Sequence, residues 1–429
     1  MTDFKQLYAE KLMSAEEAVK FIEPGDAIIY PIAPGEPNAL HKALNEYEGL
    51  DNNKLYRALT QRKTYDLPKD KLLQIAIFLA SDRQAMNEGL VELLPNHFGD
   101  TPKLIAERED QIVPMFLASP MDEEGYFSLG LSNSYVGYNL ANAKNIIIEV
   151  NENYPYTYGL NHRVHISDVT AIVEDNTPID ELPNPKIDEK SAKIGSIIAD
   201  IIPDNATLQI GYGAVPSAVM NKLTDKKGLG FHTEMLPTNA IELANKGALT
   251  NENKETFIGK TVTTFAMGSR ELYDWLDHNE DVYFLPVDVS NSVVEIGKED
   301  NLYCINATIQ VDLLGQCNSE KLPGKYYSSS GGQADFGKGV RLTKNGVGII
   351  ALNSTAGKDD ALSTIVPTLY ADAAVTTSKN DIDYVVTEYG AARLKGKTIS
   401  ERVEALIAIA HPKFRDELRE EAKKLNYIH

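Results

Sequence analysis

The chain has 429 residues, of which 43% are apolar and 24% are charged, an ordinary composition for a globular protein with more than one domain. Its formal net charge of −20 argues against a nucleic-acid partner, because such binding depends on an excess of lysine and arginine. The two cysteines form neither a disulfide framework nor a zinc motif, and no apolar run is long enough to cross a membrane. We therefore expect a cytoplasmic protein without a metal site or a membrane anchor.

Two segments, 18–44 and 197–223, align without a gap. Pro24 aligns with Pro203 and Pro37 with Pro216, both 179 positions apart. Each segment has the pattern of a helix, a turn with proline, an apolar strand, a glycine-bearing loop and a second helix. The repeat predicts two similar α/β halves. Residues 174–189 are rich in proline and acidic side chains, as a linker is. We therefore expect an N-terminal domain at 1–188 and a C-terminal domain at 189–429.

Short apolar runs recur between helical patterns. Near-continuous apolar runs of this length are typical of strands that are buried on both faces of a parallel sheet. Each half is therefore expected to hold an open, mostly parallel sheet, which binds ligands at the carboxyl ends of its strands. The runs are Leu73–Leu79, Asn145–Val150, Ala206–Ile210, Val282–Pro286, Val347–Leu352 and Tyr384–Thr387.

The loop Gly211–Val215 follows one of these strands and precedes a helix. Amide groups at a helix N-terminus suit a phosphate or an oxyanion. The loop lacks the dinucleotide fingerprint, because Pro216 stands where a third glycine is needed. NAD and ATP chemistry are therefore disfavoured.

About twenty residues later, the stretch Gly228–Met235 presents the carboxylate of Glu234 beside a glycine-rich turn. A carboxylate next to exposed amide groups can act as a nucleophile toward an acyl group while the amides receive the oxyanion. His232 would share one side of an extended segment with Glu234, either supporting or tuning it. This pattern favours acyl or CoA transfer.

Two further loops in the second half carry paired glycines or a lysine. Ser328–Phe336 allows close backbone approach to a ligand, and Ala351–Lys358 ends in a lysine that can reach a phosphate. Together with the two loops above, they predict one composite site in the second half.

Other polar residues compete for a catalytic role. Glu149 and Glu388 both end apolar runs, and we assign them structural or orienting roles. His411 joins two helical patterns between Ser400 and Leu425 and is interpreted as a structural cap or a satisfied polar group rather than a catalyst.

With these residues in view, the chain resembles the acetyl-CoA hydrolase/transferase family, and within it the 4-hydroxybutyrate and butyrate:acetate CoA-transferases. The resemblance covers nearly the whole chain. The matching motifs are Ser119–Phe127, Ile148–Pro155, Gly211–Pro216, Phe231–Met235, Asn306–Gln316, Gly331–Phe336 and Val386–Gly390.

The resemblance implies the two-domain CoA-transferase (NagB-like) fold and assigns roles to residues. Glu234 would form the enzyme–CoA thioester. The CoA contacts would be Gly211, Tyr212, Gly213, Ala214, Val215, Ile309, Gly331, Gly332 and Lys358. The loop Pro34–Pro37 is more polar than the family pattern, which leaves acyl specificity open.

The implied activity is transfer of CoA from a short-chain acyl-CoA to a free carboxylate such as acetate, butyrate or 4-hydroxybutyrate. An acyl-CoA hydrolase on the same scaffold and a non-catalytic CoA or metabolite sensor are the alternatives. The partners would be acyl-CoA and carboxylate substrates, with no permanently bound cofactor, since coenzyme A is itself a substrate. The family suggests a homo-oligomer, a dimer or larger.

Overall fold

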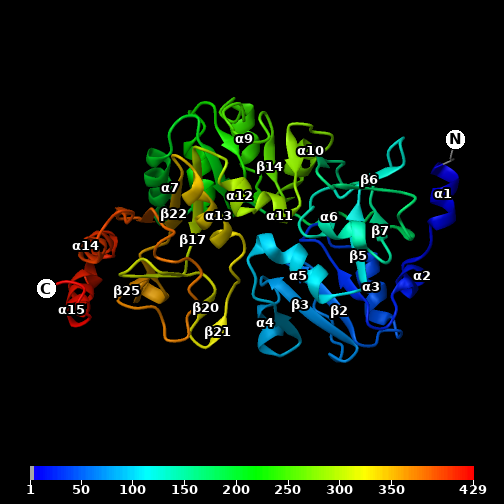
Figure 1. Ribbon diagram of the computed structural model, residues 1–429, viewed down its shortest axis with the longest axis horizontal. Helices are drawn as coiled ribbons and strands as arrows, with labels where there is room; N and C mark the ends of the chain where they lie inside the picture. The colour runs from blue at the N-terminus through cyan, green and yellow to red at the C-terminus, as the bar shows by residue number, and fades with distance from the viewer. Residues whose placement is uncertain (1–3) are drawn as a thin grey trace. The chain divides into compact units, whose positions relative to one another are not determined.

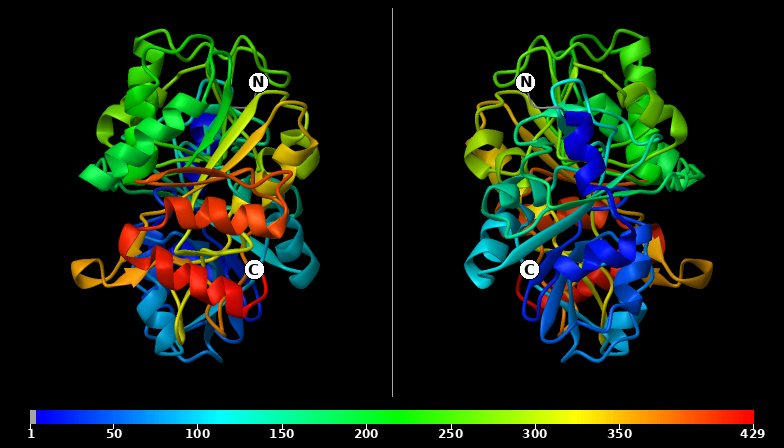
Figure 2. Two further views of the ribbon diagram at one scale, coloured as in Figure 1. Left: turned by 90° about the vertical axis from the view of Figure 1, so that its left-hand side faces the viewer. Right: turned by 90° about the vertical axis from the view of Figure 1, so that its right-hand side faces the viewer.

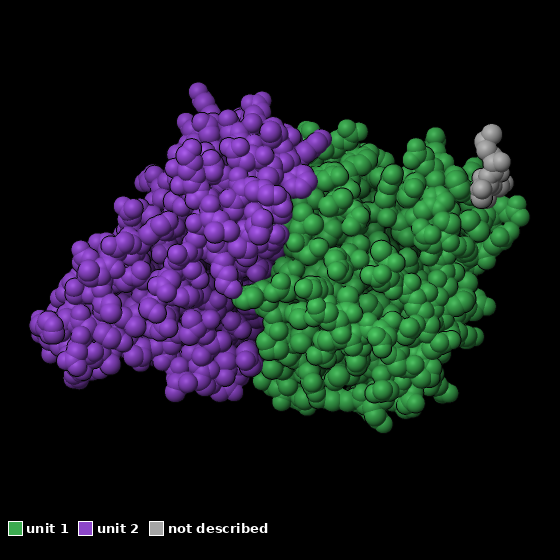
Figure 3. All heavy atoms as spheres, in the orientation of Figure 1, with its two compact units in different colours: residues 1–183, 234–238, 262–290 green, residues 184–233, 239–261, 291–429 purple. Residues whose placement is uncertain are grey.

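The computed structural model describes residues 4–429, which form two compact units (Figure 3). The first unit comprises the chain up to Pro183 together with 234–238 and 262–290, and the second comprises the remainder. The domain boundary between 188 and 189 stays a prediction. The units differ from it in two respects: the second unit already begins at Asn184, and residues 234–238 and 262–290 pack with the first unit although they come later in the sequence.

The first unit is built on a parallel sheet, whose strands β2, β3, β5 and β7 are labelled in Figure 1, and β1 is its central strand. From β1 the chain extends the sheet through β2, β3 and β4 on one side, and through β5, β7 and β10 on the other. The strands are β1 (Ala27–Ile29), β2 (Asn53–Ala58), β3 (Leu72–Phe78), β4 (Val91–Leu93), β5 (Ile112–Ala118), β7 (Ile147–Val150) and β10 (Ala171–Glu174).

Both faces of this sheet are buried, because successive side chains of a strand point to opposite faces. Ala27 and Ile29 of β1 pack in one hydrophobic core with Ile105 of α5 (Thr101–Arg108). Ile28 packs in the other core with Leu40 of α3 (Ala39–Glu46). Burial on both faces explains why the strands are apolar runs without alternation.

The second unit repeats this plan. Its sheet has the order β12-β11-β17-β22-β26-β27 and is parallel except for the last pair. The run from β12 to β26 matches the order β2-β1-β5-β7-β10 of the first unit, which confirms two similar halves. The strands are β11 (Thr207–Ile210), β12 (Gly230–Phe231), β17 (Leu302–Ala307), β22 (Val347–Ala351), β26 (Tyr384–Thr387) and β27 (Gly390–Arg393).

The predicted apolar runs are all strands, with one difference in placement. Val282–Phe284 forms β16, which lies outside the large sheets and pairs with β8 (Tyr158–Gly159). The C-terminal pattern is confirmed as two helices, α14 (Ile399–Ile409) and α15 (Arg415–Lys424), which lie side by side (Figure 2, left). His411 caps the short turn between them by accepting from the Lys413 amide, as expected.

The other elements surround these sheets. In the first unit they include α1 (Phe4–Lys11), α2 (Ala15–Ala18), α4 (Arg83–Asn87), β6 (Tyr126–Ser128), α6 (Val136–Asn139), β9 (Arg163–His165), β13 (Met235–Leu236), β15 (Phe265–Ala266), α10 (Arg270–Leu276) and α11 (Val287–Ser290). In the second unit they include α7 (Glu189–Ile201), α8 (Ala214–Lys222), α9 (Ala240–Asn245), α12 (Val293–Ile296), β18 (Gln310–Asp312), β19 (Cys317–Asn318), α13 (Gln333–Gly339) and β25 (Ile365–Val366).

Gly195 sets the close packing of α7 against α8, the helix that follows the glycine loop. A Cβ atom at Gly195 would lie 2.6 Å from the Cβ of Ala218, which is closer than any real contact. We expect Gly195→Ala to lower the free energy of unfolding by about 1–3 kcal/mol, because overpacking outweighs alanine's better helix propensity. Thermal unfolding checks this, with Ser196→Ala on the same helix as the control. A more stable Gly195→Ala variant would contradict the packing argument.

Candidate functional site

The predicted site residues of the second unit share one edge of its sheet. The loop that begins at Gly211 follows β11, Ile309 follows β17, and the loop to Lys358 follows β22. Glu388 follows β26. These strands are parallel neighbours, so their carboxyl ends meet at the edge where open α/β sheets bind ligands. The sequence placed the Gly211 loop, the loop to Lys358 and Glu388 at strand ends, but it gave no strand order that would bring them to neighbouring positions.

Glu234 lies on the segment that leaves the carboxyl end of β12. The chain passes from the second unit to the first between Thr233 and Glu234. The side chain of Glu234 is half-buried. Its carbonyl oxygen accepts from the amides of Thr264 and Phe265, at 3.0 and 3.2 Å, and from Oγ1 of Thr263 at 3.0 Å. Three donors on one carbonyl hold the backbone of the candidate nucleophile firmly.

Thr233 restrains the backbone on the N-terminal side of Glu234. Its hydroxyl accepts from the Ile210 amide at 3.2 Å and donates to the Ile210 carbonyl at 2.9 Å. Ile210 is the last residue of β11 and precedes Gly211. The residue before Glu234 is therefore hydrogen-bonded to the residue before the glycine loop.

The loop Gly211–Val215 is accessible at its start. Gly213 has φ of +143° and caps α8, and no side chain caps the first turn of that helix. Tyr212 is 41% exposed. Because the cap residue has no side chain that takes the first-turn amides of α8, an anion can accept hydrogen bonds at this helix start.

The remaining predicted contacts are more enclosed. Gly331, with φ of +54°, and Gly332 are buried at the start of α13. Ile309 is half-buried, and its amide donates to the Asn318 carbonyl at 3.0 Å. The structure gives these residues a defined backbone, and their contact with CoA stays a prediction.

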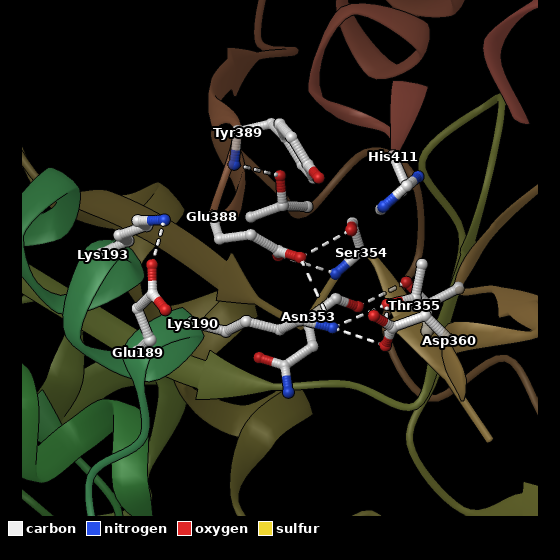
Figure 4. Close-up of polar contacts among 12 residues, drawn as sticks. Glu189, Lys190, Lys193, Asn353, Ser354, Thr355, Asp360, Glu388, Tyr389 and His411 are labelled. Atoms are coloured by element: carbon white, nitrogen blue, oxygen red, sulfur yellow. Dashed lines mark hydrogen bonds and ion pairs between the residues drawn. The ribbon is translucent and has the colours of Figure 1, made fainter. Parts of the chain in front are cut away.

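Glu388 anchors the loop that carries Lys358 (Figure 4). The Glu388 carboxylate accepts from the amide and the hydroxyl of Ser354, at 2.9 and 2.7 Å. Lys190 of α7 binds Asp360 at 2.6 Å and lies 4.0 Å from Glu388. Lys358 itself is exposed. An orienting role for Glu388 fits these contacts, and the lysine two residues before Asp360 remains available to a ligand.

Glu149 has a comparable role in the first unit. Its carboxylate is fully buried and accepts from the amides of Asn38 and Leu40, at 2.7 and 2.9 Å, at the start of α3. Burial raises the pKa of Glu149 to about 7, although the two amides oppose this effect. Glu149 is thus a buried anchor rather than an accessible nucleophile.

The polar loop Pro34–Pro37 is buried in the first unit. Glu36 is 1% exposed and accepts from the Gln61 amide at 2.9 Å, and burial raises its pKa. The acidic residue that departs from the family pattern is therefore packed inside the unit.

A buried polar cluster beside β12, the strand that precedes Glu234, was missed from the sequence. His232 is fully buried, with Nδ1 3.8 Å from Oε1 of Glu299. Burial acts to raise the pKa of Glu299, but His232, Thr256 and nearby donors lower it to about 2. His232 therefore faces Glu299, which fits the supporting role. Lys254 completes the cluster, and its polar sequence context gave no signal of burial.

A pocket of about 390 Å³ lies in the first unit, and none of the predicted site residues lines it. Met121, Glu152 and Arg270 contribute to its lining, together with the stacked rings of Tyr156 and His278. Within residues 4–429, no group of His, Cys, Asp and Glu is arranged to hold a metal ion. Nor does any helix of that range have the length and apolar character needed to span a bilayer.

Comparisons with known proteins cover the full chain. Residues 1–182 match the acetyl-CoA hydrolase/transferase N-terminal domain, and residues 268–422 match the corresponding C-terminal domain. A 4-hydroxybutyrate coenzyme A transferase of Clostridium kluyveri is 42% identical, over 98% of this chain and 99% of its own. A succinyl-CoA:cyclohexane-1-carboxylate CoA transferase of Geobacter metallireducens is 40% identical, over 99% and 98%. The crystal structure of RipA from Yersinia pestis superimposes with a TM-score of 0.92 at 38% identity and covers both chains completely.

The raised pKa of Glu149 predicts a pH dependence of stability. Between the unfolded pKa of about 4.5 and the folded pKa of about 7, the folded state binds more protons, so stability falls as pH rises through this range. We expect the stability of the wild type relative to Glu149→Gln to decrease from pH 5 to pH 8. Thermal unfolding of both proteins across this range measures the difference, and a constant difference would contradict the assignment.

Proposed function

Because the chain belongs to the acetyl-CoA hydrolase/transferase family, we propose that it transfers CoA from a short-chain acyl-CoA to a free carboxylate through a glutamyl-CoA thioester on Glu234. The acyl groups would be of the acetate, butyrate or 4-hydroxybutyrate type. The observation that supports this most directly is the shared carboxyl edge of β12, β11, β17 and β22, which is followed by the Glu234 segment, the Gly211 loop, Ile309 and the loop to Lys358 respectively.

The reaction requires only a carboxylate nucleophile and a CoA thiolate, which leaves and attacks again in each half-reaction. The Glu234 carboxylate attacks the thioester carbonyl of acyl-CoA, which gives an acyl–glutamyl anhydride and CoA thiolate. The thiolate attacks the glutamyl carbonyl, so the acyl group leaves as a carboxylate and CoA stays on Glu234. The acceptor carboxylate attacks this thioester and releases the thiolate, which then attacks the acceptor's acyl carbonyl and regenerates Glu234. An ionised carboxylate is the reactive form at neutral pH, so no general base is needed.

The loops supply stabilisation and binding. The first-turn amides of α8, beginning at Ala214, would donate to the oxyanion, and each such donor is worth roughly 3 kcal/mol. Lys358 would contact a phosphate of CoA as a point charge. Ile309 and the Gly331–Gly332 turn would contact the rest of the CoA molecule. Remote binding of CoA would help to bring the reacting groups together.

Hydrolysis is the distant alternative, since the relatives above carry the names of CoA transferases. A hydrolase would release CoA without a carboxylate acceptor, and a sensor would bind CoA without forming an adduct. We further propose that no cofactor is bound permanently, and that the protein acts as a homo-oligomer in the cytoplasm. A panel of acyl-CoA donors against carboxylate acceptors would define the acyl group, which pockets distinguish by only about 1–3 kcal/mol per methylene.

The covalent role of Glu234 is directly testable. Incubation with acyl-CoA and no acceptor should leave CoA on the peptide that contains 231–235, as detected by mass spectrometry. Borohydride should reduce this thioester and abolish activity. Glu234→Asp should lose at least about 100-fold in turnover, because the shorter side chain withdraws the carboxylate by about 1 Å.

Glu149→Gln and Glu388→Gln serve as controls, since both residues anchor backbone rather than react. Each should still accept CoA on Glu234. An adduct on Glu149 or Glu388, or full activity in Glu234→Ala, would overturn the assignment.

Lys358 should contribute binding rather than chemistry. We expect Lys358→Ala to raise the KM for acyl-CoA about tenfold with little change in kcat, because one charged contact to a phosphate is worth about 1.4 kcal/mol. Added salt should weaken wild-type binding in the same way. Steady-state kinetics with Lys246→Ala, an exposed lysine of the same unit, provide the control. An unchanged KM would return Lys358 to an ordinary surface role.

A further inference from the structure

β12 is the edge strand of the second sheet, so only one of its sides has a strand neighbour. On that side, the Gly230 and His232 amides donate to the carbonyls of Ala206 and Leu208, both at 3.0 Å. The outer side of an edge strand normally leaves its amide and carbonyl groups to water or to another chain. Here Phe231 points both backbone groups to that outer side, yet the residue is fully buried. Buried groups of this kind require partners.

Two side chains take the place of the missing strand. The Phe231 amide donates to Oδ1 of Asn251 at 2.9 Å, and the Phe231 carbonyl accepts from Nζ of Lys254 at 2.8 Å. Lys254 also donates to the Lys260 carbonyl at 2.7 Å. The outer side of the strand is therefore paired, by side chains that come from one later segment of the chain.

The fit around Lys254 is close. This lysine is 3% exposed, and a Cβ atom at Gly230 would lie 2.7 Å from its Cγ, so only glycine lets the strand pass over the lysine stem. Burial lowers the pKa of Lys254 to about 8, and the charge of Glu299 opposes that change. Glu299 is itself 1% exposed and accepts from the amides of Glu255 and Thr256, at 3.0 and 3.1 Å.

A buried lysine is costly unless its charge is compensated, and a long apolar side chain would fill the same space without that cost. The lysine does what such a side chain cannot do, because it donates to the carbonyl of Phe231, three residues before Glu234. The free-energy cost of burying this charge is therefore offset by a hydrogen bond to the strand that leads to the candidate nucleophile.

We propose that Lys254 and Asn251 are positioning residues, which fix the strand before Glu234 so that its carboxylate is held at attack distance. The proposal rests on the nucleophilic role of Glu234 given above. The charge of Glu299 favours the protonated form of Lys254, and Thr233 and the triple donation to the Glu234 carbonyl complete the restraint. A displacement of about 1 Å at a reacting group can cost about 100-fold in rate, so loosening the strand should slow the chemical step while CoA binding is retained.

The test compares Lys254→Met, which keeps the volume but removes the donor, with Lys246→Met at an exposed position. With saturating acyl-CoA and no acceptor, we expect Lys254→Met to load CoA onto Glu234 about 10–100-fold more slowly, with a KM within twofold of the wild type. Lys246→Met should load at the wild-type rate. Rates are measured well below the unfolding temperature of each variant, so that a loss of stability alone does not change them.

Asn251→Gly provides an independent variant, since Asn251 has φ of +58° and glycine accepts this conformation. It should also slow loading, whereas Asn52→Gly, at an exposed asparagine with φ of +56°, should not. If Lys254→Met does not fold, the rate at which Asn251→Gly loads CoA onto Glu234 tests the positioning role. Wild-type loading rates in the folded variants would overturn the positioning role. Absence of any CoA adduct on Glu234 in the wild type would instead overturn the proposed function.

Discussion

The need to pair every buried backbone group at the edge strand β12 restrains the segment that leads to Glu234. A two-residue strand at the margin of a sheet would ordinarily be loosely held. Here Leu208 satisfies it on one side and Asn251 with Lys254 on the other, and the next residues are fixed by Thr233 and by the donors to the Glu234 carbonyl. The segment that carries the candidate nucleophile is thus hydrogen-bonded on both sides of the point where the chain passes from the second unit to the first.

Four glutamates at strand ends or loops differ in chemistry because their surroundings differ. Glu149 and Glu388 bind backbone amides that shape neighbouring loops, and Glu299 compensates a buried lysine. Each of these three carboxylates accepts hydrogen bonds from groups of its own unit and is nearly inaccessible to solvent. Glu234 is half-buried, and its carbonyl accepts from three donors in the segment 263–265.

The duplicated halves share the order of five strands, but the loops that follow β1 and β11 differ. The loop after β1, at 31–37, is buried and carries Glu36, whereas the corresponding loop after β11 is partly exposed and begins with two glycines around Tyr212. Small residues and accessible amides at a helix start suit an anionic ligand, while a buried acidic loop does not. The two halves therefore support different roles despite a common plan.

The sequence by itself determined the duplicated parallel sheets, the glycine loops and the identity of the candidate nucleophile, because apolar runs, glycines and prolines act through local geometry. It also assigned Glu149 and Glu388 to orienting roles, which their contacts support. Only the tertiary structure showed that residues 234–238 pack with the first unit and that β16 lies outside the large sheets. The role of Lys254 was equally hidden, since its polar neighbours are those of a surface turn. A lysine's burial depends on which distant strand passes over it, and that is decided by packing between segments rather than by any local pattern.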